Sequence, residues 1–290
     1  MEKVELPNVS KIKLIATDID GTLLNKEGKI TERTKTVICK ILEKYPDLHF
    51  VLASGRSFPG TLRIREELNI LKRPNTESLL NNGTIVYDPV GSIIWQNALP
   101  KEFIIKFVSN PLSNIDYAFS AGDDAITFSK KWAEIMEKKF EEKTIIMDKK
   151  EFIKKVADDK IIIDRASVLV QEKEKEEIEN FKKEFESIRQ EYNVKCTFYK
   201  PYFLDYTQFN SHKGAGLTYL NKKLNIQKDE VIAFGDGDND LELLQNSGWP
   251  VVMANACEEL KPYGKLTTKS NKEDGVADML ERIFLKDQMN

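Results

Sequence analysis

The residues of this chain that could do chemistry are aspartates, a lysine and a serine, each beside or near a glycine. Asp18 and Asp20 stand near the N-terminus, Ser54 and Lys213 occur singly, and three aspartates fall within 236–240. Clustered carboxylates repel one another unless a cation joins them, and oxygen ligands without nearby histidine or cysteine favour Mg²⁺. A hard cation, a lysine and a hydroxyl group together form a receptor for a phosphoryl group, whose charge lies on its peripheral oxygens.

Two aspartates separated by one residue can divide the work of phosphoryl transfer. Asp18 could attack phosphorus and form an aspartyl-phosphate, which splits one hard displacement into two easier ones. Asp20 could protonate the leaving oxygen and later deprotonate the attacking water. Asp-x-Asp alone also fits a surface turn, but here Gly-Thr-Leu-Leu follows the pair at the end of an apolar run. We therefore interpret the pair as functional.

Apolar runs precede three of these polar groups and predict the strands that position them. The runs cover 12–16, 49–53 and 230–234, and they end shortly before Asp18, Ser54 and Asp236, respectively. Such runs are typical of strands buried on both faces of a parallel sheet. Because ligands of open α/β sheets bind at the carboxyl ends of the strands, we expect one site at this edge.

Helical stretches alternate with the apolar runs, as they do in a parallel sheet with helices on its faces. We therefore predict an α/β fold with a doubly wound, Rossmann-like parallel-sheet core. Its predicted helices cover 30–45, 61–68, 213–224, 241–246 and 258–263, a hairpin joins 84–87 to 92–95, and further strands cover 204–207 and 250–253.

The alternation stops between about 99 and 202. This stretch contains short predicted strands and a highly charged amphipathic helix at 173–188, but none of the polar groups described above. We interpret 99–202 as an inserted α+β domain, which divides the core into 1–98 and 203–290.

Composition excludes several classes of protein. The chain has 290 residues, 41% hydrophobic and 31% charged, with a net charge of −3, which argues against a nucleic-acid binder. No stretch approaches the ~20 apolar residues of a membrane span, and the N-terminus lacks a signal-peptide core. Three scattered cysteines and two histidines argue against a disulfide framework or a histidine-rich metal site. We expect a cytoplasmic protein, a monomer or weak homo-oligomer, without nucleic-acid or membrane partners.

In their order and surroundings, these groups resemble the motifs of the haloacid dehalogenase superfamily of phosphatases, specifically its Cof-type branch. Asp-Ile-Asp-Gly-Thr at 18–22 resembles the first motif and Ala-Ser-Gly-Arg at 53–56 the second. Ser-His-Lys-Gly at 211–214 resembles the third, and Phe-Gly-Asp-Gly-Asp-Asn-Asp at 234–240 the fourth. The resemblance spans essentially the whole core. It extends to Met-Ala-Asn-Ala at 253–256 and Asn-Lys-Glu-Asp-Gly-Val at 271–276, both typical of the branch.

The resemblance implies roles for individual residues. Asp18 would be the nucleophile and Asp20 the general acid/base. Mg²⁺ would be held by Asp18, Asp236 and the backbone carbonyl of Asp20, and Asp240 would orient the metal's water shell or the lysine. The implied phosphate contacts are Ile19, Ser54, Gly55, Lys213 and Asn239. Further candidates for substrate contacts are Arg56, Asn82 and the segments near Asp164 and Tyr202.

The function that these motifs imply is Mg²⁺-dependent hydrolysis of small phosphorylated metabolites, with sugar phosphates as the leading class, through an aspartyl-phosphate. The insertion would be an α+β cap that closes over the site and contacts the leaving group. Two alternatives remain, a phosphomutase or phosphotransferase acting on hexose phosphates and a non-catalytic phosphometabolite-binding protein. The compact fourth motif argues against the first, and the intact Asp18, Asp20, Lys213 and Asp236 argue against the second.

Overall fold

The computed structural model describes residues 5–110, 116–140, 144–170, 173–199 and 203–286. Contacts divide the chain into two compact units. The first unit comprises Met1–Trp95 and His212–Asn290, and the second comprises Gln96–Ser211. Among the described residues, no helix is both long and apolar enough to cross a membrane.

An eight-stranded sheet with the order β14-β13-β12-β1-β2-β3-β4-β5 forms the centre of the first unit. All neighbours from β14 to β3 pair in parallel, and β4 pairs antiparallel with β3. The predicted parallel-sheet α/β fold is therefore confirmed. The strands are β1 (Leu14–Thr17), β2 (His49–Ala53), β3 (Ser78–Leu80), β4 (Ile85–Tyr87), β5 (Ile93–Gln96), β12 (Val231–Gly235), β13 (Trp249–Val252) and β14 (Leu266–Thr267).

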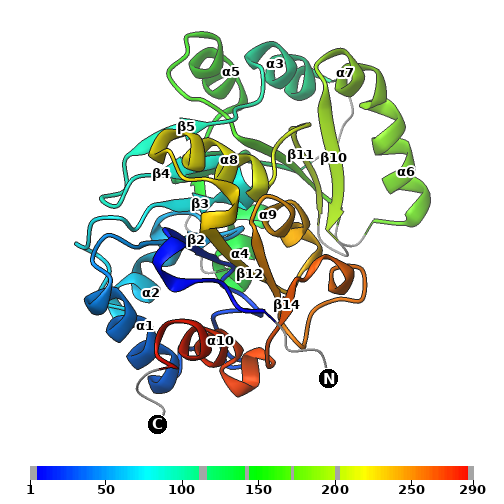
Figure 1. Cartoon of the computed structure of the whole chain (residues 1–290). Coiled ribbons are helices and arrows are strands. Elements are labelled where there is room, and N and C mark those ends of the chain that lie inside the picture. The colour runs from blue at the N-terminus through cyan, green and yellow to red at the C-terminus, as the bar shows by residue number, and fades with distance from the viewer. Residues whose placement is uncertain (1–4, 111–115, 141–143, 171–172, 200–202, 287–290) are drawn as a thin grey trace. The chain divides into compact units, whose positions relative to one another are not determined.

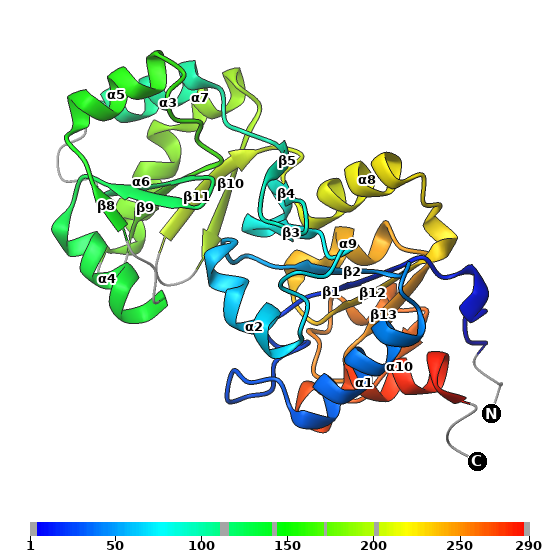
Figure 2. The ribbon, with the colours of Figure 1, turned by 90° about the vertical axis from the view of Figure 1, so that its left-hand side faces the viewer.

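Helices cover both faces of this sheet (Figure 2). Successive residues of one strand pack in the hydrophobic clusters on opposite faces. In β1, Ile15 packs in the cluster that includes α1 (Glu32–Lys44) and α10 (Gly275–Phe284). Its neighbours Leu14 and Ala16 pack in the cluster on the other face, which includes residues of α8 (Lys213–Leu224) and α9 (Leu241–Gln245). The remaining core helix is α2 (Leu62–Glu67). The central strands are thus buried on both faces, as their apolar runs predict.

The prediction of a helix at 258–263 is wrong. The structure has turns there, followed by a short 3-10 helix at Lys261–Tyr263. Pro262 lacks a backbone donor and restricts its predecessor, so an α-helix cannot continue through it. The helix predicted at 30–45 is α1, whose cap Thr31 accepts a hydrogen bond from the backbone amide of Thr34, as expected from its side chain.

The second unit, taken by itself, contains a six-stranded sheet with the order β10-β11-β9-β6-β7-β8. Figure 1 shows β10 beside β11. Its main core packs aromatic side chains, among them Phe107 and Phe185, whose ring centroids lie 4.4 Å apart. The strand predicted at 204–207 is present as β11, but its predicted place in the core is wrong, because it pairs antiparallel with β9 (Arg165–Leu169) and β10 (Val194–Tyr199) in this sheet. The strands are β6 (Tyr117–Ala121), β7 (Asp124–Thr127), β8 (Thr144–Ile146), β9 (Arg165–Leu169), β10 (Val194–Tyr199) and β11 (Phe203–Gln208). The helices are α3 (Lys101–Ser109), α4 (Lys130–Phe140), α5 (Lys149–Ala157), α6 (Lys175–Glu184) and α7 (Glu186–Glu191).

Candidate active site

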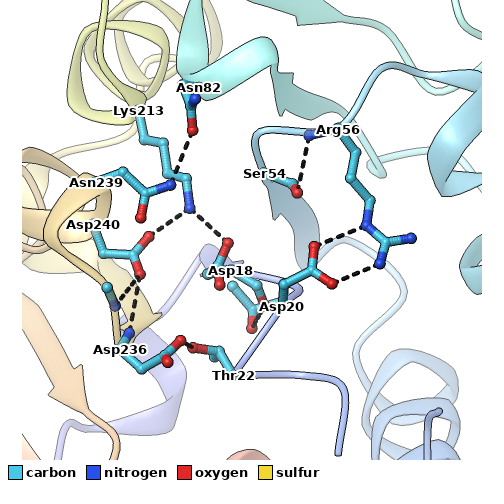
Figure 3. A network of polar contacts seen from close by, with 12 residues as sticks. Asp18, Asp20, Thr22, Ser54, Arg56, Asn82, Lys213, Asp236, Asn239 and Asp240 are labelled. Atoms are coloured by element: carbon cyan, nitrogen blue, oxygen red, sulfur yellow. Dashed lines mark hydrogen bonds and ion pairs between the residues drawn. The ribbon is translucent and has the colours of Figure 1, made fainter. Parts of the chain in front are cut away.

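A buried lysine joins two aspartates at the carboxyl edge of the core sheet (Figure 3). Lys213 Nζ lies 2.6 Å from Asp18 Oδ1 and 2.6 Å from Asp240 Oδ1. Asp18 directly follows β1, Asp240 lies beyond β12, and Lys213 is the first residue of α8. Three segments distant in sequence therefore meet here because two of them leave adjacent parallel strands.

Burial and charge oppose each other at this lysine. Burial lowers the pKa of Lys213, but the two carboxylates attract the proton more strongly, so its pKa lies above the usual range. Burial raises the pKa of Asp18, against the attraction of Lys213. The lysine therefore stays charged, and further positive charge beside Asp18 would favour the ionised carboxylate that a nucleophile requires.

Asp240 already has partners for both of its carboxylate oxygens. Its Oδ1 accepts from Lys213, and its Oδ2 accepts from the backbone N–H groups of Asp236 and Gly237 at 3.0 and 3.1 Å. These bonds fix Asp240 between the loop after β12 and the lysine. The arrangement suits a residue that orients the lysine.

Asp236 extends the acidic cluster. Single carboxylate oxygens of Asp18, Asp236 and Asp240 lie within 4.8 Å of one another. Burial and the nearby carboxylates of Asp240 and Asp20 raise the pKa of Asp236, against a hydrogen bond from Thr22 and the charge of Lys213. Crowded carboxylates with raised pKa values are an environment that a divalent cation would relieve, and carboxylate oxygens are the ligands that Mg²⁺ prefers. The donor set at Asp18 and Asp236 therefore fits Mg²⁺.

The turn after β1 approaches Asp236 closely. Gly21 has a φ of +85°, and a Cβ at this position would lie 2.3 Å from Asp236 Oδ2. Only glycine fits both the conformation and the space. The following Thr22 donates from Oγ1 to Asp236 Oδ1 at 2.6 Å. Gly21 and Thr22 of the first motif thus position the carboxylate of Asp236 in the fourth motif.

A second group of residues follows β2. Ser54 is almost fully buried, and its Oγ accepts from the backbone N–H of Arg56 at 3.2 Å. The guanidinium of Arg56 donates to both carboxylate oxygens of Asp20, from Nε at 2.8 Å and from Nη2 at 2.6 Å. The Asp20 side chain is therefore held by Arg56, outside the cluster that Lys213 joins.

Two predicted asparagines pair with each other. Asn239 Nδ2 donates to Asn82 Oδ1 at 2.9 Å. Asn82 has a φ of 56°, in the left-handed region, and a Cβ on Gly55 would lie 3.1 Å from its Oδ1. The loop after β3 therefore joins the second and fourth motifs.

Three other predicted positions behave differently. The side chain of Ile19 is buried in the core, so only its backbone could reach a phosphate. Asp164 belongs to the second unit and is buried, where it accepts from Gln96 Nε2 at 2.7 Å and from the backbone of Gly122 at 2.8 Å. Tyr202 lies outside the described residues.

The sequence did not predict a set of hydrogen bonds made by Asn255 and Asn271, in the motifs at 253–256 and 271–276, which we call the brace. Asn255 Nδ2 donates to the carbonyl of Gly21 at 2.9 Å and to Asp236 Oδ2 at 3.2 Å. Asn255 Oδ1 in turn accepts from the backbone of Asn271, whose side chain donates to the carbonyl of Leu24. The motifs at 253–256 and 271–276 were a signal for this brace, but their spacing alone does not show what they contact.

Comparisons with known proteins identify the family. A family model described as haloacid dehalogenase-like hydrolase matches residues 15–280. A putative phosphatase of Buchnera aphidicola is 31% identical over 280 residues, covering 94% of this chain and 96% of its own length. The chain belongs to the haloacid dehalogenase-like hydrolases, and the family predicted from the motifs is confirmed.

Two further relatives show the range of this similarity. The 5-amino-6-(5-phospho-D-ribitylamino)uracil phosphatase YitU of Bacillus subtilis is 26% identical and covers 95% of this chain and 98% of its own. The crystal structure of a haloacid dehalogenase-like hydrolase from Bacteroides thetaiotaomicron has a TM-score of 0.79 at 26% identity. It covers 94% of this chain and 100% of its own, so the likeness includes both units.

Proposed function

We propose that this chain, a phosphoric monoester hydrolase of the haloacid dehalogenase-like family, is a Mg²⁺-dependent phosphatase of small phosphorylated metabolites. The observation that carries the proposal is the buried Lys213 placed between Asp18 and Asp240, with Asp236 in the same cluster. A lysine and a cation site beside a carboxylate nucleophile supply what phosphoryl transfer needs, positioned positive charge around a phosphoryl group.

Asp18 and Asp236 would hold the Mg²⁺ ion, together with the backbone carbonyl of Asp20. When bound, the ion would neutralise charge on the phosphoryl oxygens. Lys213 would offset the charge of the phosphorylated Asp18, and Asp240 holds the lysine in place. The proposed phosphate contacts are the backbone of Ile19 and Gly55 and the side chains of Ser54, Lys213 and Asn239.

The proposed reaction has two steps. A carboxylate oxygen of Asp18 forms a bond to phosphorus while the bond to the leaving oxygen breaks, and Asp20 gives its proton to that oxygen. Water then attacks the phosphorus of the aspartyl-phosphate and gives a proton back to Asp20. The bond between Asp18 and phosphorus breaks, and inorganic phosphate leaves.

Substrate selection is proposed to reside in the second unit, Gln96–Ser211. We propose that this unit is the α+β cap expected at about 99–202, because it has its own core and holds none of the residues proposed for phosphoryl transfer. Sugar phosphates are the substrate class that we propose. The phosphorylated ribityl compound in the name of the Bacillus relative is consistent with a phosphorylated polyol. We expect the enzyme to act in the cytoplasm as a monomer or weak homo-oligomer.

The test is a panel of phosphorylated metabolites, assayed for inorganic phosphate with purified protein in EDTA and again with excess Mg²⁺. We expect release only with Mg²⁺, strongest on sugar phosphates, and none from an Asp18→Asn variant. Transfer of phosphate between positions of a hexose without release would instead establish a phosphomutase. Tight binding of a sugar phosphate without any turnover would establish a binding protein.

A further inference from the structure

The guanidinium of Arg56 forms a bidentate ion pair with Asp20, donating one hydrogen bond to each carboxylate oxygen (Figure 3). The two residues lie 36 positions apart, on the loops after β1 and β2, two neighbouring parallel strands. A bidentate pair between a planar fork and a carboxylate fixes orientation as well as distance. The Asp20 side chain is 58% exposed, so without this partner it could turn freely in water.

Arg56 is itself anchored at several points. Its backbone N–H donates to Ser54 Oγ at 3.2 Å, and its carbonyl accepts from the backbone of Asn81 at 3.0 Å. Its Nη1 donates to the carbonyl of Gly60 at 3.3 Å. The side chain therefore extends from a fixed backbone toward Asp20, and the same residue contacts the hydroxyl proposed to bind phosphate.

We propose that Arg56 is a positioning residue that holds Asp20 for proton transfer, and not a direct contact of the substrate. The inference rests on the proposed function. Because the guanidinium has two donors, it can stay hydrogen-bonded to one carboxylate oxygen of Asp20 while the second carboxylate oxygen delivers or receives a proton. A lysine, which presents a compact point charge on a flexible stem, cannot reproduce this grip. Proton transfer depends on such geometry, and a misplacement of about 1 Å can cost about 100-fold in rate.

If Arg56 and Asp20 formed only an ordinary exposed ion pair, the expected effect of removing it would differ from that of a positioning residue. Such pairs contribute only about 0–1 kcal/mol to stability, and their loss would not discriminate between substrates. A direct substrate contact would also differ, because its loss would weaken binding whether or not Asp20 is present. The three roles therefore separate in a double-mutant cycle.

The experiment measures kcat/KM for wild type, Arg56→Lys, Asp20→Asn and the double variant. Two substrates are used, a hexose phosphate, whose leaving alkoxide needs a proton, and p-nitrophenyl phosphate, whose leaving group does not. We expect Arg56→Lys to lower kcat/KM for the hexose phosphate about 10- to 100-fold and to change that for p-nitrophenyl phosphate less than about threefold. In the Asp20→Asn background, Arg56→Lys should cause no further loss. Arg63→Lys is the matched control, because Arg63 donates to the carbonyl of Gly28 and should leave both values unchanged.

Equal losses on both substrates, or a further loss in the Asp20→Asn background, would show that Arg56 acts independently of Asp20. Unchanged values for Arg56→Lys would reduce the pair to a surface contact. Wild-type protein without phosphatase activity would contradict the proposed function instead. A crystal structure of Arg56→Lys tests the inference without turnover. Displacement of the Asp20 carboxylate supports positioning, and an unmoved carboxylate overturns it.

Discussion

The ammonium group of Lys213 lies 2.6 Å from Asp18 Oδ1, and none of the lysine side chain is exposed. Asp240 is equally close on the other side and is also fully buried. A buried charge of this kind is strongly unfavourable unless partners surround it. The same contacts that keep the lysine charged would place positive charge beside a phosphorylated Asp18.

Lys213→Met should therefore both destabilise the core and abolish turnover. Removing one partner leaves two buried carboxylates without compensation, which costs about 3–5 kcal/mol in the free energy of unfolding. The matched control is Lys13→Met. Lys13 pairs with Glu230 at 2.7 Å but is 54% exposed, so its loss should cost less than about 1 kcal/mol. Urea unfolding followed by circular dichroism measures both, and similar losses for the two variants would contradict the buried network.

Metal binding should stabilise the folded protein through Asp236. A ligand that binds only the folded state adds about 2.7 kcal/mol when its concentration is 100 times Kd. We expect Mg²⁺ to raise the Tm of wild type and of the control Asp229→Asn, whose side chain is exposed. Asp236→Asn should show little or no rise, because a neutral amide replaces the negative charge of a proposed ligand. A full Mg²⁺-dependent rise in Asp236→Asn would place the ion elsewhere.

Asn255→Ala should weaken Mg²⁺ binding although Asn255 is not a proposed ligand. The amide braces both Gly21 and Asp236, and residues that orient metal ligands typically contribute about 10- to 100-fold in affinity. We expect a loss of that size in the Mg²⁺ concentration that half-activates phosphate release. Asn8→Ala, which removes a hydrogen bond to Ser10 near the N-terminus, serves as the control. An activation curve identical to wild type would show that the brace is dispensable.

The strands and motif positions could be predicted because they depend on local patterns. The apolar runs before Asp18, Ser54 and Asp236 identify strands buried on both faces, and the carboxyl ends of parallel strands meet. The pairing of Arg56 with Asp20 could not be predicted, since it depends on how two loops leave neighbouring strands. The same applies to the brace at Asn255, because its contacts join residues up to 234 positions apart. The helix predicted at 258–263 failed because Pro262 prevents an α-helix from continuing through that segment.

A pH-dependent effect should arise in the second unit at Asp164. Burial raises the pKa of Asp164 to about 6, against the hydrogen bonds from Gly122 and Gln96, whereas its unfolded value is 3.8. The folded state therefore binds the proton more tightly. The contribution to stability is fully present below about pH 4 and is lost as pH rises through about 6.

The Asp164→Asn variant isolates this contribution. The unfolding free energy of wild type minus that of the variant should fall by roughly 2 kcal/mol between pH 4 and pH 7, from the pKa difference of about two units. Urea titrations at several pH values measure the difference. A difference that is constant with pH, or that rises, would contradict the burial of a protonated Asp164.

The covalent role of Asp18 is the central claim, and trapping the intermediate tests it most directly. Wild-type protein is mixed with Mg²⁺ and a slight excess of a sugar phosphate that the enzyme hydrolyses. The mixture is quenched with acid within one turnover and reduced with borohydride. Peptide mass spectrometry then locates any reduced acyl phosphate, which appears as homoserine in place of aspartate. We predict homoserine at position 18 alone. With p-nitrophenyl phosphate, whose leaving group needs no proton, the Asp20→Asn variant should accumulate more of it than wild type, because that variant lacks the base for hydrolysis. Rapid phosphate release with unmodified Asp18 at every quench time, or homoserine at another aspartate, would contradict the account.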